Sequence, residues 1–456
     1  MNINPNIFRE YDIRGIAGKD LTEEIMECIG KAYVAYMKTK KAIKKGSVVV
    51  GRDGRVSSKS FSWALIEGIT SAGMNVIDLG EVPTPLTYFA MNTMEVDGGL
   101  MITASHNPGE YNGLKVGVGK TTIYGEQIQE FRRYVEKGEY PVKKRDVIIT
   151  KTNIVPKYEK RILRDVKLKR KLKVVVDAGN GVGGVVAVPL FEKLGCEVIP
   201  LYCEVDGSFP NHHPDPTKEE YLKDLAKTVK KHKADIGIAF DGDVDRLGGC
   251  DEKGRMFRGD QLLVLFARDI LKQKPGATII GEVKCSRVMY EEIKKAGGNP
   301  VMWRTGHSHI KAAMIKLKAE VAGEMSGHIF FKHRWYGFDD AIYSACRLLE
   351  LLSKEDKPLS ELLDTVPQKP STPEIEVSCP DDKKFDVVKK IIRHFEEQGL
   401  KVIKVDGARV EFPDGWGLIR ASNTSPKLVI RAEAETRKKL SEIKTMLENI
   451  VSKFNE

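Results

Sequence analysis

The feature that most constrains the fold is a pattern that occurs three times along the chain. In each copy, a run of β-branched residues ends in a Gly/Asp-rich turn. A helix-like segment follows, and a second apolar run begins after a glycine. The copies cover residues 47–80, 173–202 and 277–303. Apolar runs that alternate with helices are typical of parallel strands buried on both faces, so the pattern predicts three α/β domains.

The last part of the chain has a different character. Residues 366–373 contain three prolines and indicate a stiff linker. Residues 409–422 predict a hairpin that turns near Asp414 and Gly415, and residues 428–435 predict a further strand. The final helix is expected to be amphipathic, with one apolar face made of Leu440, Ile443, Leu447, Ile450, Val451 and Phe454. We therefore expect a smaller α+β domain at the C-terminus. The predicted domains are 1–152, 153–253, 254–367 and 368–456.

Composition excludes several classes of protein. Hydrophobic residues make up 41% and charged residues 30%, the balance of a globular chain. No apolar run approaches the ~18 residues of a membrane span, and the N-terminus lacks the pattern of a secretory signal. The seven cysteines are scattered without a Cys-x-x-Cys pair, so neither a disulfide framework nor a zinc site is expected. We expect a cytoplasmic protein with no membrane partner.

The net charge of +10 suits anionic partners such as phosphorylated metabolites or nucleic acid. The basic runs at residues 38–45 and 167–173 have no interleaved aromatic residues. Such runs are typical of solvated faces, so we expect no nucleic-acid partner.

Three aspartates follow the apolar run at residues 236–240. Asp241, Asp243 and Asp245 stand at alternate positions of a loop at the carboxyl end of a predicted strand, where ligands bind in open α/β sheets. Bunched carboxylates repel one another without a cation, and ligation by oxygen alone favours Mg²⁺. The spacing also nearly matches an EF-hand, but Arg246 occupies the position that needs glycine. We reject the EF-hand and predict a magnesium site.

A serine-containing loop follows the apolar run at residues 98–102. Ser105 lies within Thr103–Gly109, among small and polar residues. Serine is a poor nucleophile unless a base or a metal assists it, and an ordinary Ser/Asn turn is the alternative. The nearby prediction of a metal site and of phosphate-binding loops favours a chemical role.

Two further loops carry polar groups suited to a phosphorylated sugar. Residues 420–426 combine a guanidinium, hydroxyls and an amide, which suit phosphate, although a Ser/Thr-rich turn explains them equally well. Residues 323–328 place Glu and Ser on one loop, which can grip vicinal hydroxyls of a sugar. His328 in this loop is, taken alone, more typical of a satisfied loop histidine. No phosphate-binding G-x-x-x-x-G-K-[ST] motif is present, so nothing indicates ATP.

A glycine-rich turn offers a different function. Residues 179–184 fit G-x-G-x-x-G after a predicted strand, and Glu204 lies at the distance of a ribose-binding acid. Pro189 falls five residues into the expected helix, which suits a dinucleotide-binding helix poorly. A tight turn is the favoured interpretation, and a nicotinamide-dependent oxidoreductase stays open as the alternative.

Six segments together resemble the α-D-phosphohexomutase superfamily, closest to its phosphomannomutase/phosphoglucomutase group. They occur in family order and span nearly the whole chain, at residues 11–15, 103–108, 241–246, 303–308, 323–328 and 420–426. The resemblance implies three related α/β domains with mixed sheets and a smaller α+β C-terminal domain around a central cleft. It also implies an enzyme that interconverts hexose 1-phosphate and hexose 6-phosphate, of mannose or glucose, through a phosphoserine and a hexose 1,6-bisphosphate.

The resemblance assigns roles to individual residues. Ser105 is the implied phosphorylated serine, whose phosphate completes the site of one Mg²⁺ on Asp241, Asp243 and Asp245. Lys115 and His328 are the two candidates for the general acid/base. The other implied residues surround the transferring group (Arg14, His106, Asn107, Arg246), the sugar (Glu324, Ser326, His307, Lys284) and the non-reacting phosphate (Arg420, Ser422, Asn423, Thr424, Tyr11).

Two departures from the family pattern bear on the substrate. Arg304 stands where Lys is common, and one basic residue replaces another. Met325 stands where glucosamine-phosphate mutases usually carry Gln, which favours mannose and glucose phosphates. A phosphoglucosamine mutase, a metal-dependent sugar phosphatase and the nicotinamide enzyme stay open as alternatives, whereas the Asp cluster argues against a non-enzymatic anion-binding protein.

Overall fold

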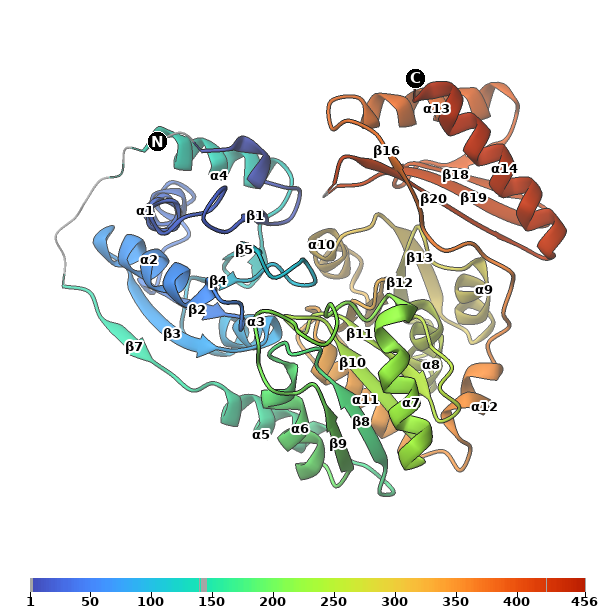
Figure 1. Ribbon diagram of the computed structural model, residues 1–456, viewed down its shortest axis with the longest axis horizontal. Coiled ribbons are helices and arrows are strands. Elements are labelled where there is room, and N and C mark those ends of the chain that lie inside the picture. The colour runs from blue at the N-terminus through green and yellow to red at the C-terminus, as the bar shows by residue number, and fades with distance from the viewer. Residues whose placement is uncertain (1–2, 139, 141–145, 424, 456) are drawn as a thin grey trace.

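The computed structural model describes residues 3–138, 140, 146–423 and 425–455. In this part of the chain the strands form four sheets that follow one another along the sequence (Figure 1). Three are mixed sheets flanked by helices, and the fourth is antiparallel with its helices on one side. The predicted fold class is confirmed, while the exact domain boundaries stay predictions.

The first sheet has the order β1-β5-β4-β2-β3-β7, with β6 paired to β5. Its central strand β2 shows why a continuous Val run predicts a buried strand, because Val48 and Val50 enter one hydrophobic core while Val49 enters another. The strands are β1 (Ile13–Ile16), β2 (Ser47–Arg52), β3 (Asn75–Glu81), β4 (Gly98–Ile102), β5 (Tyr111–Val118), β6 (Thr121–Thr122) and β7 (Ile149–Lys151). The helices are η1 (Pro5–Ile7), α1 (Glu23–Thr39), α2 (Ser58–Ser71), α3 (Thr84–Thr93) and α4 (Glu126–Lys137).

The second sheet has the order β11-β10-β8-β9. Strand β8 lies parallel to β9 and β10, and β11 returns antiparallel to β10, so the loop 241–246 lies at the carboxyl end of β10. The strands are β8 (Lys173–Asp177), β9 (Glu197–Leu201), β10 (Ile236–Phe240) and β11 (Leu247–Asp251). The helices are α5 (Val155–Asp165), α6 (Gly183–Lys193), η2 (Glu219–Leu222) and α7 (Lys223–His232).

The third sheet has the order β13-β12-β14-β15 and repeats this arrangement, with an antiparallel last strand. Its strands are β12 (Thr278–Glu282), β13 (Asn299–Trp303), β14 (Val321–Gly323) and β15 (Ile329–Phe331). Its helices are α8 (Gly259–Gln273), α9 (Arg287–Lys295), α10 (His307–Leu317), α11 (Ala341–Ser353) and α12 (Leu359–Asp364). In all three predicted repeats the two apolar runs form parallel neighbouring strands, as expected.

The fourth sheet, β16-β20-β19-β18-β17, is antiparallel throughout. The predicted hairpin is formed by β18 and β19, and its turn lies between Phe412 and Gly415. The strands are β16 (Ile375–Ser378), β17 (Lys401–Ile403), β18 (Ala408–Phe412), β19 (Gly415–Ala421) and β20 (Lys427–Ala434). Helices α13 (Lys384–Glu397) and α14 (Arg437–Phe454) cover one face of this sheet (Figure 1).

The hydrophobic cores show how the four sheets are joined. One core runs continuously from Val49 in the first sheet to Val366 after α12, and so connects the first three sheets. The fourth sheet has its own core against α13 and α14, including Ile443 and Leu447 of the predicted apolar face. A small cluster of Val283, Trp416 and Leu418 links it to the third sheet. None of the helices described is long and apolar enough to cross a membrane.

Candidate active site

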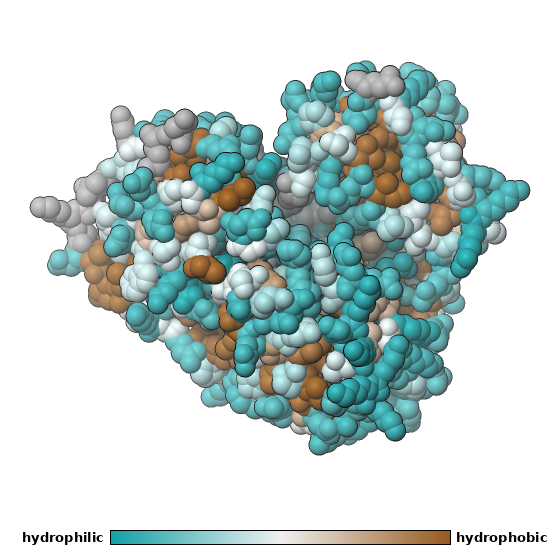
Figure 2. Space-filling view, in the orientation of Figure 1, coloured by the Kyte–Doolittle hydropathy of each residue, from teal (hydrophilic) through white to brown (hydrophobic). Residues whose placement is uncertain are grey.

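A cleft of about 990 Å³ lies where the four sheets meet, and it is visible as a notch between two lobes in Figure 2. Most of the predicted site residues line it, although they come from four separate sheets. These are Tyr11, Arg14, Ser105, His106, Lys115, Asp245, Arg246, Lys284, His307, Glu324, Ser326, His328, Arg420, Ser422 and Asn423. Asp241 and Asp243 are buried behind the wall of this cleft. Thr424 lies outside the described residues.

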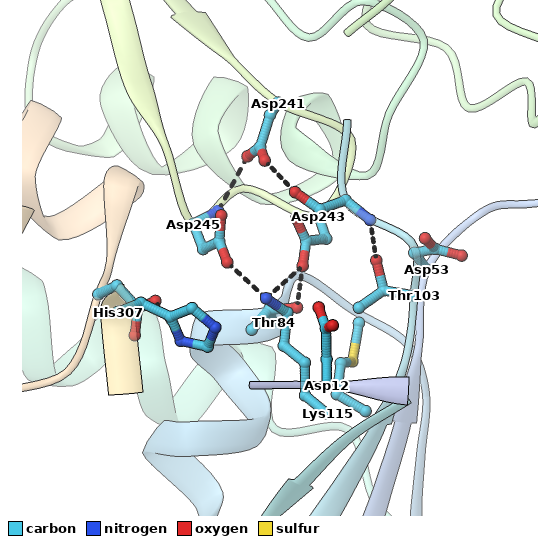
Figure 3. Close-up of polar contacts among 12 residues, drawn as sticks. Asp12, Asp53, Thr84, Thr103, Lys115, Asp241, Asp243, Asp245 and His307 are labelled. Atoms are coloured by element: carbon cyan, nitrogen blue, oxygen red, sulfur yellow. Dashed lines mark hydrogen bonds and ion pairs between the residues drawn. The ribbon is translucent and has the colours of Figure 1, made fainter. Parts of the chain in front are cut away.

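The three aspartates converge in the loop between β10 and β11 (Figure 3). All three are fully buried, and each offers an oxygen within 4.8 Å of the others. The backbone N–H groups of Asp245 and Arg246 donate to Asp241 Oδ1 at 3.1 Å, which fixes the turn of the loop. The chain therefore presents a compact group of oxygens, as the spacing predicts.

The electrostatics of this group suit a hard cation. Burial and the neighbouring carboxylates raise the pKa of Asp241 well above its usual range, and the pKa of Asp243 is raised for the same reasons. In the described part of the chain, the buried Oδ1 atoms of Asp243 and Asp245 have no hydrogen-bond partner. Unpaired buried carboxylate oxygens are costly unless a cation binds them. The donor set thus fits Mg²⁺, which prefers oxygen ligands.

Ser105 lies directly beside the aspartates. Its Oγ donates a hydrogen bond to Asp241 Oδ2 at 2.6 Å and lies 3.2 Å from His106 Nδ1. The φ angle of Ser105 is +52°, a left-handed conformation that costs a residue other than glycine about 1 to 3 kcal/mol. Gly242 allows the aspartate loop to approach, because a Cβ there would lie 2.6 Å from the Ser105 carbonyl oxygen. The two loops therefore fit together only with a strained serine and a glycine.

Lys115 projects from β5 toward the same carboxylates (Figure 3). Its Nζ lies 2.8 Å from Asp245 Oδ2 and 3.7 Å from Asp243 Oδ2. Burial acts to lower the pKa of Lys115, but these two carboxylates outweigh it and raise the pKa well above its usual value. The ammonium group therefore places a positive charge at the centre of the site.

His328 connects the second and third sheets. Its Nε2 accepts a hydrogen bond from Arg246 Nε at 3.1 Å, so in the neutral ring the proton is on Nδ1. Nδ1 lies 3.6 Å from Asp245 Oδ1 and 3.5 Å from Asp339 Oδ2. Both candidates for the general acid/base, Lys115 and His328, thus contact Asp245.

The loop 324–328 joins β14 to β15 and faces the cleft. Glu324 Oε1 accepts a hydrogen bond from the backbone N–H of Gly306 at 2.7 Å, next to His307 at the start of α10. Burial lowers the pKa of His307 well below its usual value, which favours a neutral imidazole. Lys284 forms an ion pair of 2.7 Å with Glu374. The predicted sugar-binding residues lie together in one part of the cleft wall.

The predicted phosphate-binding loop follows β19. Arg420 Nε is held by Asp406 Oδ2 at 3.0 Å, and the backbone N–H of Ser422 donates to the Lys427 carbonyl at 2.9 Å. Asn423 Nδ2 donates to the hydroxyl of Tyr11, a residue that precedes the first sheet. The structure therefore brings the Arg420 loop and Tyr11 together, as the resemblance implies.

Several residues of the site were not predicted. Thr84, at the start of α3, donates its hydroxyl to Asp243 Oδ2 at 2.6 Å (Figure 3). Asp12 accepts a hydrogen bond from Arg14, a predicted residue that also donates to Asn107 at 2.6 Å. Arg55 donates to the backbone of the Ser105 loop. The available signal was position, because Thr84 and Arg55 follow the carboxyl ends of β3 and β2.

The glycine-rich turn at residues 179–184 packs against the chain itself. A Cβ at Gly181 would lie 2.8 Å from Gly242, and one at Gly184 would lie 2.4 Å from the Cys203 carbonyl oxygen. These glycines are required by close packing beside the aspartate loop, as expected for a tight turn. Close packing therefore accounts for the G-x-G-x-x-G spacing, which was the observation in favour of a nicotinamide-dependent oxidoreductase.

Comparison with known families gives matches along almost the whole chain. Four successive segments of the chain match family models, each of which describes one domain of phosphoglucomutase/phosphomannomutase. They are the alpha/beta/alpha domains I, II and III at residues 5–141, 156–254 and 258–369, and the C-terminal domain at residues 374–450.

Individual relatives agree with these matches. The chain is 48% identical over 446 residues to a phosphomannomutase/phosphoglucomutase of Pseudomonas aeruginosa, covering 97% of this chain and 95% of that protein. It is 46% identical over 454 residues to a phosphoglucomutase of Neisseria gonorrhoeae, covering 99% of this chain and 97% of that protein. A crystal structure of a phosphoglucomutase/phosphomannomutase family protein from Burkholderia thailandensis is similar with a TM-score of 0.92 at 41% identity, covering 99% of this chain and 98% of that one.

Proposed function

The chain belongs to the phosphoglucomutase/phosphomannomutase family and is a phosphohexomutase, and we propose that it interconverts the 1- and 6-phosphates of mannose and glucose by way of Ser105. One observation carries the proposal: Ser105 Oγ lies 2.6 Å from Asp241 in a cleft that also contains the Arg420 loop. A nucleophile beside a carboxylate cluster and a separate group of phosphate donors suit transfer between two ends of one substrate.

We assign one Mg²⁺ per chain to Asp241, Asp243 and Asp245, together with the phosphate carried by Ser105. Bound Mg²⁺ would neutralise negative charge on the transferring phosphoryl group. The assignment is supported by the oxygen-only donors and by the unpaired buried oxygens of Asp243 and Asp245. Around this site, Arg14 and Arg246 add positive charge to the cleft wall.

The proposed reaction has two phosphoryl transfers. In the first, a free hydroxyl oxygen of hexose 1-phosphate attacks the phosphorus of phosphoserine 105, the bond between Ser105 Oγ and phosphorus breaks, and the hydroxyl proton passes to a base. The product is hexose 1,6-bisphosphate, which then returns its other phosphoryl group to Ser105 Oγ and leaves hexose 6-phosphate. Lys115 and His328 are the candidates for the general acid/base, because both contact Asp245 beside Ser105. Lys115, as an ammonium group, would act first as the acid that gives a proton to the departing Ser105 Oγ.

The rest of the cleft binds and orients the substrate. Arg420, Ser422, Asn423 and Tyr11 are proposed to hold the non-reacting phosphate, at either end of the sugar in turn. Glu324, Ser326, His307 and Lys284 are proposed to contact the sugar hydroxyls. Arg420 suits a phosphate because Asp406 orients its guanidinium through Nε, and a guanidinium can present a pair of parallel N–H groups to a phosphate.

A ³¹P NMR time course tests the proposal. Purified protein with Mg²⁺ and a trace of hexose 1,6-bisphosphate is given mannose 1-phosphate, and in a second run glucose 1-phosphate. Growth of the 6-phosphate signal in both runs is expected. Growth of inorganic phosphate alone would indicate a sugar phosphatase, and conversion of glucosamine 1-phosphate in preference to both sugars would indicate a phosphoglucosamine mutase.

A further inference from the structure

Arg55 is a buried arginine beneath the loop that carries Ser105. It lies between β2 and α2, and its side chain has no exposed surface. Strands β2 and β4 are parallel neighbours, so the segments that follow them, with Arg55 and Ser105, emerge side by side. No part of Arg55 is among the groups that line the cleft in the described chain.

All five N–H groups of the Arg55 guanidinium are used. Nε donates to Asp53 Oδ2 at 3.2 Å. The other four donate to backbone carbonyls of the Ser105 loop and of the first residue of β5: Nη2 to Ser105 and Asn107, each at 2.7 Å, and Nη1 to Pro108 at 2.6 Å and Tyr111 at 3.0 Å. A planar fork with five fixed donors can bond four carbonyls at once, which a lysine ammonium cannot do.

The carbonyl of Ser105 is the central contact. It accepts from Arg55 Nη2, and Gly242 of the aspartate loop packs against it as well. The same residue holds the left-handed φ of +52° that directs its Oγ to Asp241. A strained conformation of this kind persists only where surrounding contacts impose it. Arg55 supplies such a contact at the strained residue itself.

The guanidinium is itself held from two sides. Asp53 Oδ1 accepts from Ser58 Oγ and from the backbone N–H of Arg55, so the carboxylate is oriented before it bonds Nε. On the other face, the ring of Phe209 lies 5.1 Å from the Arg55 guanidinium carbon. Phe209 belongs to a segment of the second α/β unit. The contacts that hold the Arg55 guanidinium therefore come from both the first and the second α/β units.

We propose that Arg55 is a positioning residue for phosphoryl transfer, which holds the Ser105 loop in its strained form while the serine gains and loses its phosphate. It acts through the backbone and touches neither the substrate nor the reacting atoms. The inference rests on the proposed role of Ser105. A loop that relaxed by about 1 Å would move Oγ from its place beside Asp241, and misplacement of this size costs about 100-fold in rate.

The test compares Arg55→Lys and Arg55→Met with Arg52→Lys as the matched control. Arg52 ends the same strand, but its guanidinium bonds the surface carboxylate of Glu81 at 2.8 Å. For both Arg55 variants we expect kcat to fall by about 100-fold and KM for hexose 1-phosphate to change less than about threefold, because the substrate-binding loops are untouched. Rapid-quench mass spectrometry should show the same fall in the rate at which hexose 1,6-bisphosphate phosphorylates Ser105. Arg52→Lys should stay within about twofold of the parent on every measure.

The proposal is overturned if Arg55→Lys keeps kcat within about fivefold of the parent, since charge without the fork would then suffice. It is also overturned if the loss lies in KM rather than in the phosphorylation rate of Ser105. Should Arg55→Met lack a cooperative thermal transition, Asp53→Asn replaces it, with an expected kcat loss of about tenfold at unchanged KM. Ser105→Ala, measured alongside, separates the two hypotheses: retained activity there contradicts the role of Ser105, and normal kcat in Arg55→Lys contradicts only the role of Arg55.

Discussion

Ser105 is the residue on which the proposed reaction depends. Its side chain lies between Asp241 and His106, and burial together with Arg246 and Arg14 lowers the pKa of His106 well below its usual value. His106 is therefore neutral near pH 7 and can accept or donate one hydrogen bond to Oγ. The serine hydroxyl is oriented on both sides before any substrate binds.

Replacing Ser105 by Ala should remove nearly all mutase activity. The expected fall in kcat is at least about 1,000-fold, because the group that carries the phosphate is lost. The fold should be intact, since the backbone contacts of the loop do not use Oγ. Activity by ³¹P NMR and the thermal transition by circular dichroism check both statements. Turnover within about tenfold of the parent would refute a phosphoserine intermediate at this residue.

Asp243→Asn should weaken both the metal response and the rate. The variant removes one negative charge and changes one of the three convergent carboxylates, so the Mg²⁺ concentration for half-maximal activity should rise at least about tenfold. Asp235→Asn is the control, because Asp235 lies at the opposite end of β10 and pairs with Arg170 at 3.2 Å. Calorimetric titration with Mg²⁺ supplies a readout independent of turnover. Equal titrations for the two variants would count against the assigned site.

At this scale, sequence predicts the groups that lie in one loop and misses those that meet across the fold. Asp241, Asp243 and Asp245 were predictable because they are two residues apart after an apolar run. The hydroxyl of Thr84 bonds a carboxylate 159 positions away, and Arg55 bonds a carbonyl 50 positions away. Neither contact has a local pattern, because each arises only from the order of strands in the sheet or the packing of two sheets.

Among the secondary-structure elements, too, some could be predicted from the local sequence pattern and others could not. Strands such as β2 were predictable because both faces enter a core, so the run is apolar at every position. Strand β7 was not, because all three of its residues are exposed and it only extends the sheet edge beside β3. The predicted apolar face of α14 includes four buried residues, while Leu440 and Phe454 at its ends are only partly buried.

Glu374, in the segment between α12 and β16, should make the stability of the folded protein depend on pH. Burial acts to raise the pKa of Glu374, but Lys284 outweighs it and lowers the pKa to about 2. A carboxyl whose pKa falls on folding stabilises the folded state above its ordinary pKa, and this contribution is lost as the pH falls toward the folded value. The side chain is 32% exposed, so solvent screens part of the effect.

We therefore expect Glu374→Gln to lower the melting temperature at neutral pH. The difference from the parent should be constant above about pH 5 and should shrink as the pH falls from about 4.5 to 2. Differential scanning calorimetry of both proteins across this range provides the measurement. Glu397→Gln, an exposed position at the end of α13, is the control that should show no such difference. A Glu374→Gln difference that stays constant down to pH 2.5 would contradict the assigned ion pair.

At the scale of the whole molecule, the cleft depends on the assembly of all four units, because it forms only where the four sheets meet. The resemblance predicted this arrangement, whereas composition and periodicity alone reach no further than three α/β units and a smaller one. Three of the four share a continuous core, and the fourth joins them through the linker, a small cluster around Trp416 and polar contacts. The Arg420 loop therefore reaches the cleft from a separately packed unit.

Arg420→Ala tests what that separate unit contributes. Loss of a charged hydrogen bond to phosphate costs about 1.5 to 3 kcal/mol, so KM for hexose 1-phosphate should rise about 10- to 100-fold. Arg393→Ala, on the exposed side of α13, should leave KM unchanged. Steady-state kinetics with both sugars decide the matter, and an unaltered KM in Arg420→Ala would refute the phosphate-binding role.

Tyr11 is a side chain that joins three of the four sheets. Its hydroxyl donates to the Thr305 carbonyl at 3.0 Å and accepts from Asn423, so it joins the segment before β1 to the third and fourth sheets. Tyr11→Phe removes both bonds and keeps the ring. One such bond is worth about 1 kcal/mol, which predicts a rise in KM of about fivefold, with kcat less affected.

The same variant should also change the shape of the free protein. With fewer contacts between the fourth unit and the rest, small-angle X-ray scattering is expected to give a larger radius of gyration for Tyr11→Phe than for the parent. Tyr33→Phe is the matched control, since its hydroxyl bonds the Gly117 carbonyl at 2.6 Å inside the first unit. That control should lower stability without changing KM or the radius of gyration. If Tyr11→Phe leaves both quantities unchanged, the linker, the Trp416 cluster and the other polar contacts, such as those of Arg409 with the Val283 and Cys285 carbonyls, are sufficient to hold the fourth unit in place.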